Sequence, residues 1–134
     1  MGPSRTQAKK AGITLDAGAL IALDRGASRM IALLERALTS KRTFRVPAGS
    51  LGQVWSDGRT QANLARFLRS REVEVIPLDE SLARSCGELC GSRGTSDVTD
   101  ASVVIVARQH GDVIITSDAA DLRRLDSKAY IVPI

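Results

Sequence analysis

Short runs of β-prone residues alternate with longer helical segments along the chain, and this alternation constrains the fold more than any other feature. The predicted strands cover residues 13–15, 43–46, 73–76, 113–116 and 130–132. Strands that alternate with helices are joined by crossover connections, which place helices on both faces of a mainly parallel sheet. The sequence therefore predicts an α/β three-layer sandwich with a mainly parallel sheet of four or five strands.

Between these runs, apolar residues recur at the three- and four-residue spacing of helices. The predicted helices cover residues 16–23, 27–38, 48–55, 64–68, 79–90, 96–109 and 117–125. We expect Gly91 to close the helix at 79–90. The β-branched run 103–106 would also suit a strand. The length of the segment 96–109, its capping start at Ser96 or Asp97 and the stop at Gly111 favour a buried helix.

The length and composition are those of a soluble globular domain. The 134 residues suit a single domain over the whole chain, and 43% are hydrophobic and 25% charged. No apolar run is long enough to cross a bilayer. The basic N-terminal stretch is not followed by the apolar segment that a secretion signal requires. We therefore expect a cytoplasmic protein without a membrane partner, with residues 1–11 as a flexible basic tail.

The two cysteines are predicted to be buried small hydrophobes. Cys86 and Cys90 lie four apart in a predicted helix, where Cβ atoms are ~5–6 Å apart, beyond the ~3.5–4.5 Å of a disulfide. His110 is the only histidine, so the further ligands of a zinc site are missing.

The charge balance is mildly basic and suits a polyanionic partner. Nineteen Lys and Arg against fifteen Asp and Glu give a net charge of +4. Aromatic residues are only 3%, which argues against an aromatic stacking platform for RNA. Binding to RNA would then rest on phosphate contacts. The candidates for these contacts are Arg25, Arg59, Arg66, Arg93 and Arg123.

Aspartates stand at the junctions between strands and helices. Asp16 follows the first predicted strand, and Asp118 follows the strand at 113–116. Asp97 and Asp100 lie one turn apart at the start of the helix between them. In parallel sheets, ligands bind at the carboxyl ends of the strands. Clustered carboxylates raise one another's pKa unless they hold a cation, and all-oxygen ligation favours Mg²⁺ or Mn²⁺.

A purely structural interpretation exists for each acid taken alone. Asp97 and Asp118 are good helix N-caps, and Asp100 and Asp121 are favourable acids in a first helical turn. Asp16 fits this interpretation less well, because it interrupts an apolar run. The combination of all these positions favours a metal site.

Four motifs in a fixed order resemble one family. They are Leu15-Asp16-Ala17, Val46-Pro47-Ala48 with Gln53-Val54-Trp55, Asp97-Val98-Thr99-Asp100-Ala101 and Thr116-Ser117-Asp118. Together they resemble the PIN-domain nucleases, and within these the VapC-type toxins of bacterial toxin–antitoxin pairs. The resemblance extends from residue 13 to residue 134.

The resemblance implies a PIN-like fold and a metal-dependent endoribonuclease. The metal-site acids would be Asp16, Asp100 and Asp118, with Asp97 as an additional catalytic acid and the Thr116 hydroxyl as a support for the carboxylates. A water activated by Mg²⁺ or Mn²⁺ would attack the RNA phosphodiester in line and leave 5′-phosphate and 3′-hydroxyl ends. The resemblance also implies a homodimer and a cognate antitoxin that covers the acidic groove.

Gln53 departs from the family pattern, which usually has a glutamate at this position. An amide can hydrogen-bond a metal-bound water or ligate weakly through its carbonyl oxygen, or it can be an ordinary polar helix residue. Gln53 therefore keeps open a degenerate PIN domain that binds RNA or a protein without cutting.

Phosphoryl transfer through an aspartyl phosphate is a second enzyme class that uses an aspartate at the end of a strand. That chemistry requires another aspartate two residues after Asp16, and Gly18 stands there. This class is therefore disfavoured.

Overall fold

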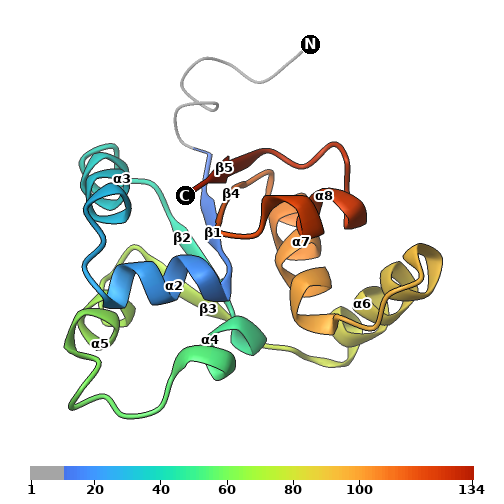
Figure 1. Cartoon of the computed structure of the whole chain (residues 1–134), viewed down its shortest axis with the longest axis horizontal. Helices are drawn as coiled ribbons and strands as arrows, with labels where there is room; N and C mark the ends of the chain where they lie inside the picture. Colours follow the sequence, from blue (N-terminus) through green and yellow to red (C-terminus); the bar gives the residue numbers. More distant parts are fainter. Residues whose placement is uncertain (1–10) are drawn as a thin grey trace.

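The computed structural model describes residues 11–134, so all but one residue of the predicted basic tail lie outside the described part (Figure 1). Five strands form one sheet in the order β3-β2-β1-β4-β5, and every pairing is parallel. They are β1 (Ile13–Leu15), β2 (Phe44–Pro47), β3 (Val73–Ile76), β4 (Val113–Thr116) and β5 (Ile131–Pro133). The predicted strands are confirmed, and the ends of two of them differ by one residue.

Helices cover both faces of this sheet, as Figure 1 shows. They are α2 (Ala17–Asp24), α3 (Ser28–Thr39), α4 (Ala48–Val54), α5 (Ala62–Leu68), α6 (Glu80–Arg93), α7 (Val98–His110) and α8 (Ala119–Leu125). Because successive side chains of a strand point to opposite faces, Ile115 packs with α2, α3 and α5 while Ile114 packs with α6, α7 and α8. The predicted three-layer α/β sandwich is confirmed.

Two predicted helix ends differ from the structure for identifiable reasons. The helix α6 does not end at Gly91 but continues to Arg93, and the left-handed residue that caps it is Gly94, with φ 67°. The helix α8 begins at Ala119 rather than at residue 117. The Thr116 hydroxyl accepts a hydrogen bond from the Asp118 amide and so holds residues 117–118 in a turn.

The segment that was ambiguous between helix and strand is the buried helix α7. Asp97 caps its start, and Gly111 ends it with a left-handed conformation, φ 68°. The β-branched residues 103–106 are all buried within it. Burial against two layers of the fold outweighs their intrinsic preference for strands.

The cysteine prediction is confirmed, since Cys86 and Cys90 are buried free thiols among α6, α7 and α8. Within residues 11–134, none of the helices combines the length and apolar character needed to cross a membrane.

A buried ion pair joins three strands close to the amino end of β4. The Asp112 carboxylate accepts hydrogen bonds from the Thr14 hydroxyl of β1 at 2.8 Å and from Nη1 of Arg45 of β2 at 2.7 Å. A Cβ atom on Gly12 would lie only 2.4 Å from that Nη1 and 2.5 Å from Asp112 Oδ1. Glycine at this position therefore makes room for the pair.

Candidate metal centre

Asp16 comes directly after β1 and caps the helix α2. Its Oδ1 accepts a hydrogen bond from the Ala19 amide at 2.8 Å, and its Oδ2 accepts one from the Thr116 hydroxyl. Only 5% of the residue is exposed, and burial raises the pKa of Asp16 although these hydrogen bonds lower it. The expectation that Asp16 fits a capping role poorly is wrong, because the chain turns into α2 at this residue.

Thr116 links two of the predicted site acids. It is the last residue of β4, beside β1 in the sheet, and it is fully buried. Its hydroxyl donates to Asp16 and accepts from the Asp118 amide at 2.8 Å. One hydroxyl therefore fixes the carboxylate of Asp16 and the backbone that carries Asp118.

Gly18 allows the first turn of α2 to approach the loop after β4. A Cβ atom at this position would lie 1.8 Å from Ser117 Oγ and 2.9 Å from Ser117 Cβ, distances that real atoms do not reach. It would also lie 3.5 Å from Oδ1 of Asp16. The sequence pattern gave Gly18 no role in the site, because its role depends on a contact between distant segments.

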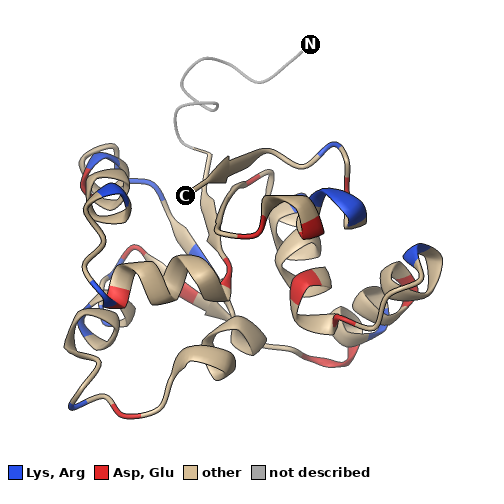
Figure 2. Cartoon of the chain, viewed as in Figure 1, with Lys and Arg blue, Asp and Glu red and all other residues tan. Residues whose placement is uncertain are grey.

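Three carboxylates gather where α7 and α8 begin. One oxygen each of Asp100, Asp118 and Asp121 lie within 4.8 Å of one another. The structure thus brings Asp100 and Asp118 together as predicted and adds Asp121, which the sequence offered only as a first-turn acid. Asp16 lies next to Asp118 through Thr116 rather than within this group. We call Asp100, Asp118 and Asp121 the acidic cluster (Figure 2).

The capping interpretation holds for one of the two predicted helix N-caps and not for the other. Asp97 does cap α7, because its Oδ1 accepts a hydrogen bond from the Asp100 amide at 2.9 Å. Asp118 stands at the N-cap position of α8 but makes no capping hydrogen bond with its side chain. Capping therefore accounts for Asp97 and does not account for Asp118.

The acids of the cluster disfavour one another's ionisation. The pKa of Asp100 is raised to about 7, first by burial and then by the negative charges of Asp97, Asp118 and Asp121. The pKa of Asp118 is raised first by a hydrogen bond with the Asp121 side chain and then by burial and by nearby charges. The charge of Arg124 opposes this increase. The cluster thus has negative charge that a cation would compensate.

A small pocket of about 260 Å³ adjoins the cluster and has arginines on its wall. Asp97, Asp100 and Asp121 line it together with Arg93 and Arg124. Nη1 of Arg124 lies 3.5 Å from Oδ1 of Asp121, and 80% of the Arg124 side chain is exposed. Sequence reasoning missed Arg124 and chose its neighbour Arg123. The two arginines lie next to each other on α8, and only the orientation of this helix decides which of them lines the pocket.

Gln53 and the other four predicted arginines are not among the residues that line this pocket. Arg123 is exposed on α8 and is not among the residues that line it. Arg25 follows α2, Arg66 lies on α5, and Arg59 pairs with Asp57 in the loop between α4 and α5. Gln53 lies exposed on α4. A larger pocket of about 490 Å³, lined by Arg108 and Asp126 among others, contains none of the acidic cluster.

Neither a protein-family model nor a curated protein matches the sequence. Solved structures do match the fold. One is VapBC2 from Rickettsia felis bound to a DNA fragment from its promoter, with a sequence identity of 15% and a TM-score of 0.69. That match covers 91% of this chain and 98% of the other. A toxin–antitoxin complex from Klebsiella pneumoniae is 16% identical with a TM-score of 0.68, and it covers 90% and 96% of the two chains.

A third structure is VapC20 from Mycobacterium tuberculosis, described as a toxin that cleaves the sarcin–ricin loop. It is 22% identical with a TM-score of 0.58, and the match covers 75% of this chain and 85% of the other. At sequence identities this low, the comparison is evidence about the fold alone. The fold agrees over most of both chains. The predicted PIN-like fold is therefore confirmed, because this chain shares its architecture with VapBC2 and VapC20.

Proposed function

We propose that the chain is a divalent-metal-dependent endoribonuclease that acts as the toxin of a toxin–antitoxin pair. The observation that carries this proposal is the acidic cluster, in which oxygens of Asp100, Asp118 and Asp121 lie within 4.8 Å of one another. The net charge of +4 suits a polyanionic substrate, and VapC20, whose fold this chain shares, is described as a toxin that cleaves the sarcin–ricin loop.

The donor set of the cluster fits Mg²⁺ or Mn²⁺. All three groups are carboxylates, and hard divalent cations prefer oxygen ligands while keeping other positions for water and substrate phosphate. The raised pKa values of Asp100 and Asp118 reflect repulsion and burial that a bound cation would offset. Such a cation supplies a Lewis acid for the phosphodiester and makes a bound water more acidic.

The remaining residues of the site would orient these groups. Thr116 fixes Asp16 and the backbone of Asp118, and Asp97 fixes the first turn of α7, which carries Asp100. The buried Asp16 adds negative charge beside Asp118 and completes the predicted set of catalytic acids. Arg93 and Arg124 on the pocket wall would contact phosphate oxygens next to the bond that is cut.

The toxin role rests on the fold. Structures that match it over most of the chain include a toxin–antitoxin complex from Klebsiella pneumoniae and VapC20, which is described as a toxin. We accordingly propose a cognate antitoxin, a homodimer and a cytoplasmic location for this chain, which would act as a single domain. The expected products of RNA cleavage are a 5′-phosphate and a 3′-hydroxyl.

The direct test is RNA cleavage by the purified, antitoxin-free protein. Total cellular RNA is incubated with Mg²⁺ or Mn²⁺ and the wild-type, Asp16→Asn, Asp100→Asn or Asp118→Asn protein. Glu88→Gln, at an exposed position on α6, is the control that removes a distant carboxylate. We expect discrete cuts by the wild type and the control, and loss of cutting in the aspartate variants and in EDTA.

Two results would count against this function. Cutting that persists in EDTA or in the Asp100→Asn and Asp118→Asn proteins would remove the acidic cluster from the reaction. RNA that binds to the wild type but is never cut would instead support the degenerate binding domain, which the amide of Gln53 keeps open.

A further inference from the structure

Trp55 is a large aromatic side chain that the fold leaves 42% exposed. It is the only tryptophan of the chain and directly follows the helix α4. Burial of an aromatic ring contributes strongly to folding, so a ring at the surface forgoes part of that stabilisation. Trp55 belongs neither to the acidic cluster nor to the hydrophobic core.

The side chain of Gln61 bridges the backbone on both sides of Trp55. Its Oε1 accepts hydrogen bonds from the amides of Ser56 at 2.7 Å and Asp57 at 3.1 Å. Its Nε2 donates to the carbonyl oxygen of Val54 at 2.8 Å. The backbone on both sides of the ring is therefore fixed before any ligand binds, which lowers the entropic cost of binding.

Gly58 supports one edge of the Trp55 ring. A Cβ atom on Gly58 would lie 3.0 Å from Cζ2 and 3.1 Å from Cη2 of the indole. The ring therefore lies against bare backbone, and a side chain at position 58 would push it away. The contact supports one edge of the ring, and 42% of the residue stays exposed to solvent.

The surroundings of the ring suit a nucleic acid better than a protein. Residues 56–61 are polar apart from Gly58, and the side chain of Arg59 is 92% exposed although its Nη2 lies 3.3 Å from Oδ2 of Asp57. The core of a protein interface gathers several apolar anchors, whereas single aromatic rings beside basic side chains are typical of single-strand binding. The net charge of +4 favours the same class of partner.

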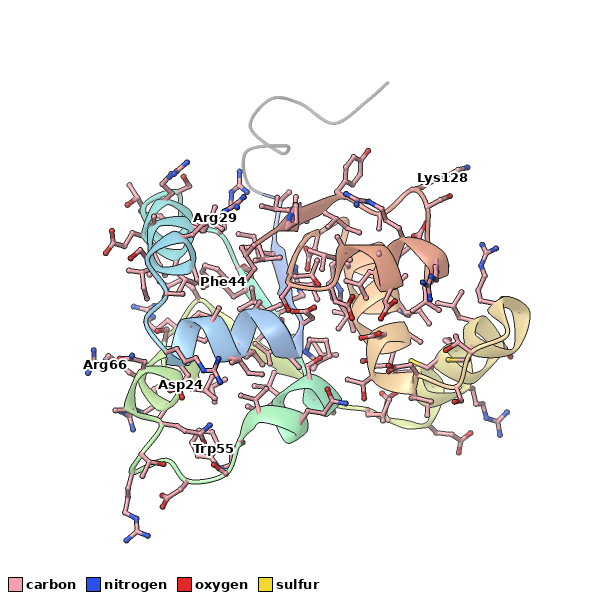
Figure 3. The ribbon with its side chains drawn as sticks, viewed as in Figure 1. Asp24, Arg29, Phe44, Trp55, Arg66 and Lys128 are labelled. Atoms are coloured by element: carbon pink, nitrogen blue, oxygen red, sulfur yellow. The ribbon has the colours of Figure 1, made fainter. Side chains whose placement is uncertain are left out.

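The helix α4 runs from the first turn of α7, which carries Asp100, to Trp55. At the start of α4, a Cβ on Gly49 would lie 3.5 Å from Oγ1 of Thr99, the neighbour of Asp100. Trp55 stands at the other end, which Figure 3 shows lying away from α7. Six residues of helix span about 9 Å, a length equal to roughly three nucleotides stacked at ~3.4 Å.

We propose that Trp55 stacks on an unpaired base of an RNA strand whose phosphodiester lies at the acidic cluster, a few nucleotides away. The position of the cut strand rests on the nuclease function proposed above, whereas the stacking contact does not. Stacking on Trp55 requires an unpaired base, because a base within a duplex cannot offer its face. The contact therefore selects single-stranded RNA, a loop or an RNA end. This adds one aromatic contact to the phosphate contacts expected from the sequence.

The single tryptophan makes the contact directly measurable. A short single-stranded oligoadenylate is titrated into the wild-type protein in EDTA, so that the strand stays intact, while tryptophan emission is recorded. We expect emission to change and saturate with the single strand and to change little with an RNA duplex. Anisotropy of labelled RNA then gives affinities for the variants.

We expect Trp55→Ala to weaken binding by about 5- to 150-fold, the range of one base–aromatic stack, and Trp55→Phe to weaken it less. Tyr130→Ala removes the other exposed aromatic, which is 74% exposed and precedes the edge strand β5, and should change the affinity less than about twofold. Thermal unfolding of each variant checks that it folds. Trp55→Phe keeps an aromatic ring beside Gly58, so it tests stacking in a variant whose loop packing is largely retained.

RNA that binds without changing the emission, or that binds Trp55→Ala as tightly as the wild type, would overturn the proposal. Cleavage of RNA in either case would leave the nuclease function intact, so the two failures are distinguishable. An emission change on adding the antitoxin, with none on adding RNA, would assign Trp55 to a protein interface instead.

Discussion

Thr116 and Gly18 are the residues that determine where the site acids lie. Thr116 hydrogen-bonds to Asp16 and to the Asp118 backbone, and Gly18 lets α2 approach Ser117. Neither carries a charge, yet both place charged groups on different segments. Residues that orient metal ligands in this way commonly affect metal affinity as much as catalysis.

Replacing Thr116 with valine tests this role. The variant keeps the shape of the side chain and removes both hydrogen bonds, so we expect a roughly 10- to 100-fold loss of RNA cleavage and of Mn²⁺ affinity. Thr116→Ser restores the hydroxyl and should recover most of both. If the valine and serine variants cleaved RNA equally well, the hydroxyl would have no role in the site.

Arg124 and its neighbour Arg123 form a matched pair for a second test. Only Arg124 lines the pocket beside the cluster. If Arg124 contacts substrate phosphate, Arg124→Ala should lower kcat/KM for RNA by about 10- to 150-fold, the effect of a hydrogen bond to a charged group. Arg123→Ala should stay within about twofold. Equal losses in the two variants would indicate only a general effect of positive charge.

The pKa of Asp100 predicts how pH affects the stability of the metal-free protein. In the folded chain this pKa is about 7, against an ordinary value of 3.8. Between these values the folded state binds more protons than the unfolded state, so the contribution of Asp100 to stability falls as pH rises from about 4 to about 7. Asp16 and Asp118 are shifted in the same direction.

A bound cation should remove this penalty. We therefore expect Mn²⁺ to raise the Tm more at about pH 8 than at about pH 5.5, measured against EDTA, because carboxylates must be ionised to bind the metal. Asp100→Asn should have a smaller dependence on both pH and Mn²⁺. A Tm increase that is the same at both pH values would contradict the linkage.

At the scale of the elements, the ion pair of Arg45 and Asp112 holds the sheet together away from the acids. Asp112, directly before β4, accepts hydrogen bonds from Arg45 of β2 at 2.7 Å and from Thr14 of β1 at 2.8 Å. Asp112→Ala would leave the half-buried Arg45 guanidinium without its carboxylate, and we expect a loss of about 3–5 kcal/mol in the free energy of unfolding.

Glu74→Gln is the control for this change. Glu74 also lies near Arg45, at 3.8 Å, but its side chain is 59% exposed, so its removal should cost less than about 1 kcal/mol. Urea unfolding of the two variants gives both numbers. Similar losses would show that Asp112 acts as a surface charge rather than as a buried partner.

The strand at 113–116 could be predicted from its run of β-prone residues. The helix α7 could be predicted from its length, its capping start and the stop at Gly111, and the structure has both elements. The start of α8 could not be predicted, because it depends on the hydrogen bond between Thr116 and the Asp118 amide. The end of α6 depends on which of two glycines adopts the left-handed conformation.

At the scale of the whole molecule, the order of the parallel strands brings the site together. The strands β1 and β4 are neighbours in the sheet, so Asp16 and Thr116 meet at their carboxyl ends although they are 100 positions apart, and Asp118 lies beside them. The sequence predicted this convergence. It did not predict Asp121 or Arg124, because their roles depend on how α8 is turned toward α7.

Calorimetric titration of Mn²⁺ into the metal-free protein tests the central claim most directly. We predict saturable binding to the wild type and to Glu88→Gln, and at least about tenfold weaker binding to Asp118→Asn and Asp121→Asn. Asp121 is decisive, since its place in the site comes from the structure alone. A wild-type protein that binds no Mn²⁺, or an Asp121→Asn protein that binds it equally well, would contradict the acidic cluster as a metal centre.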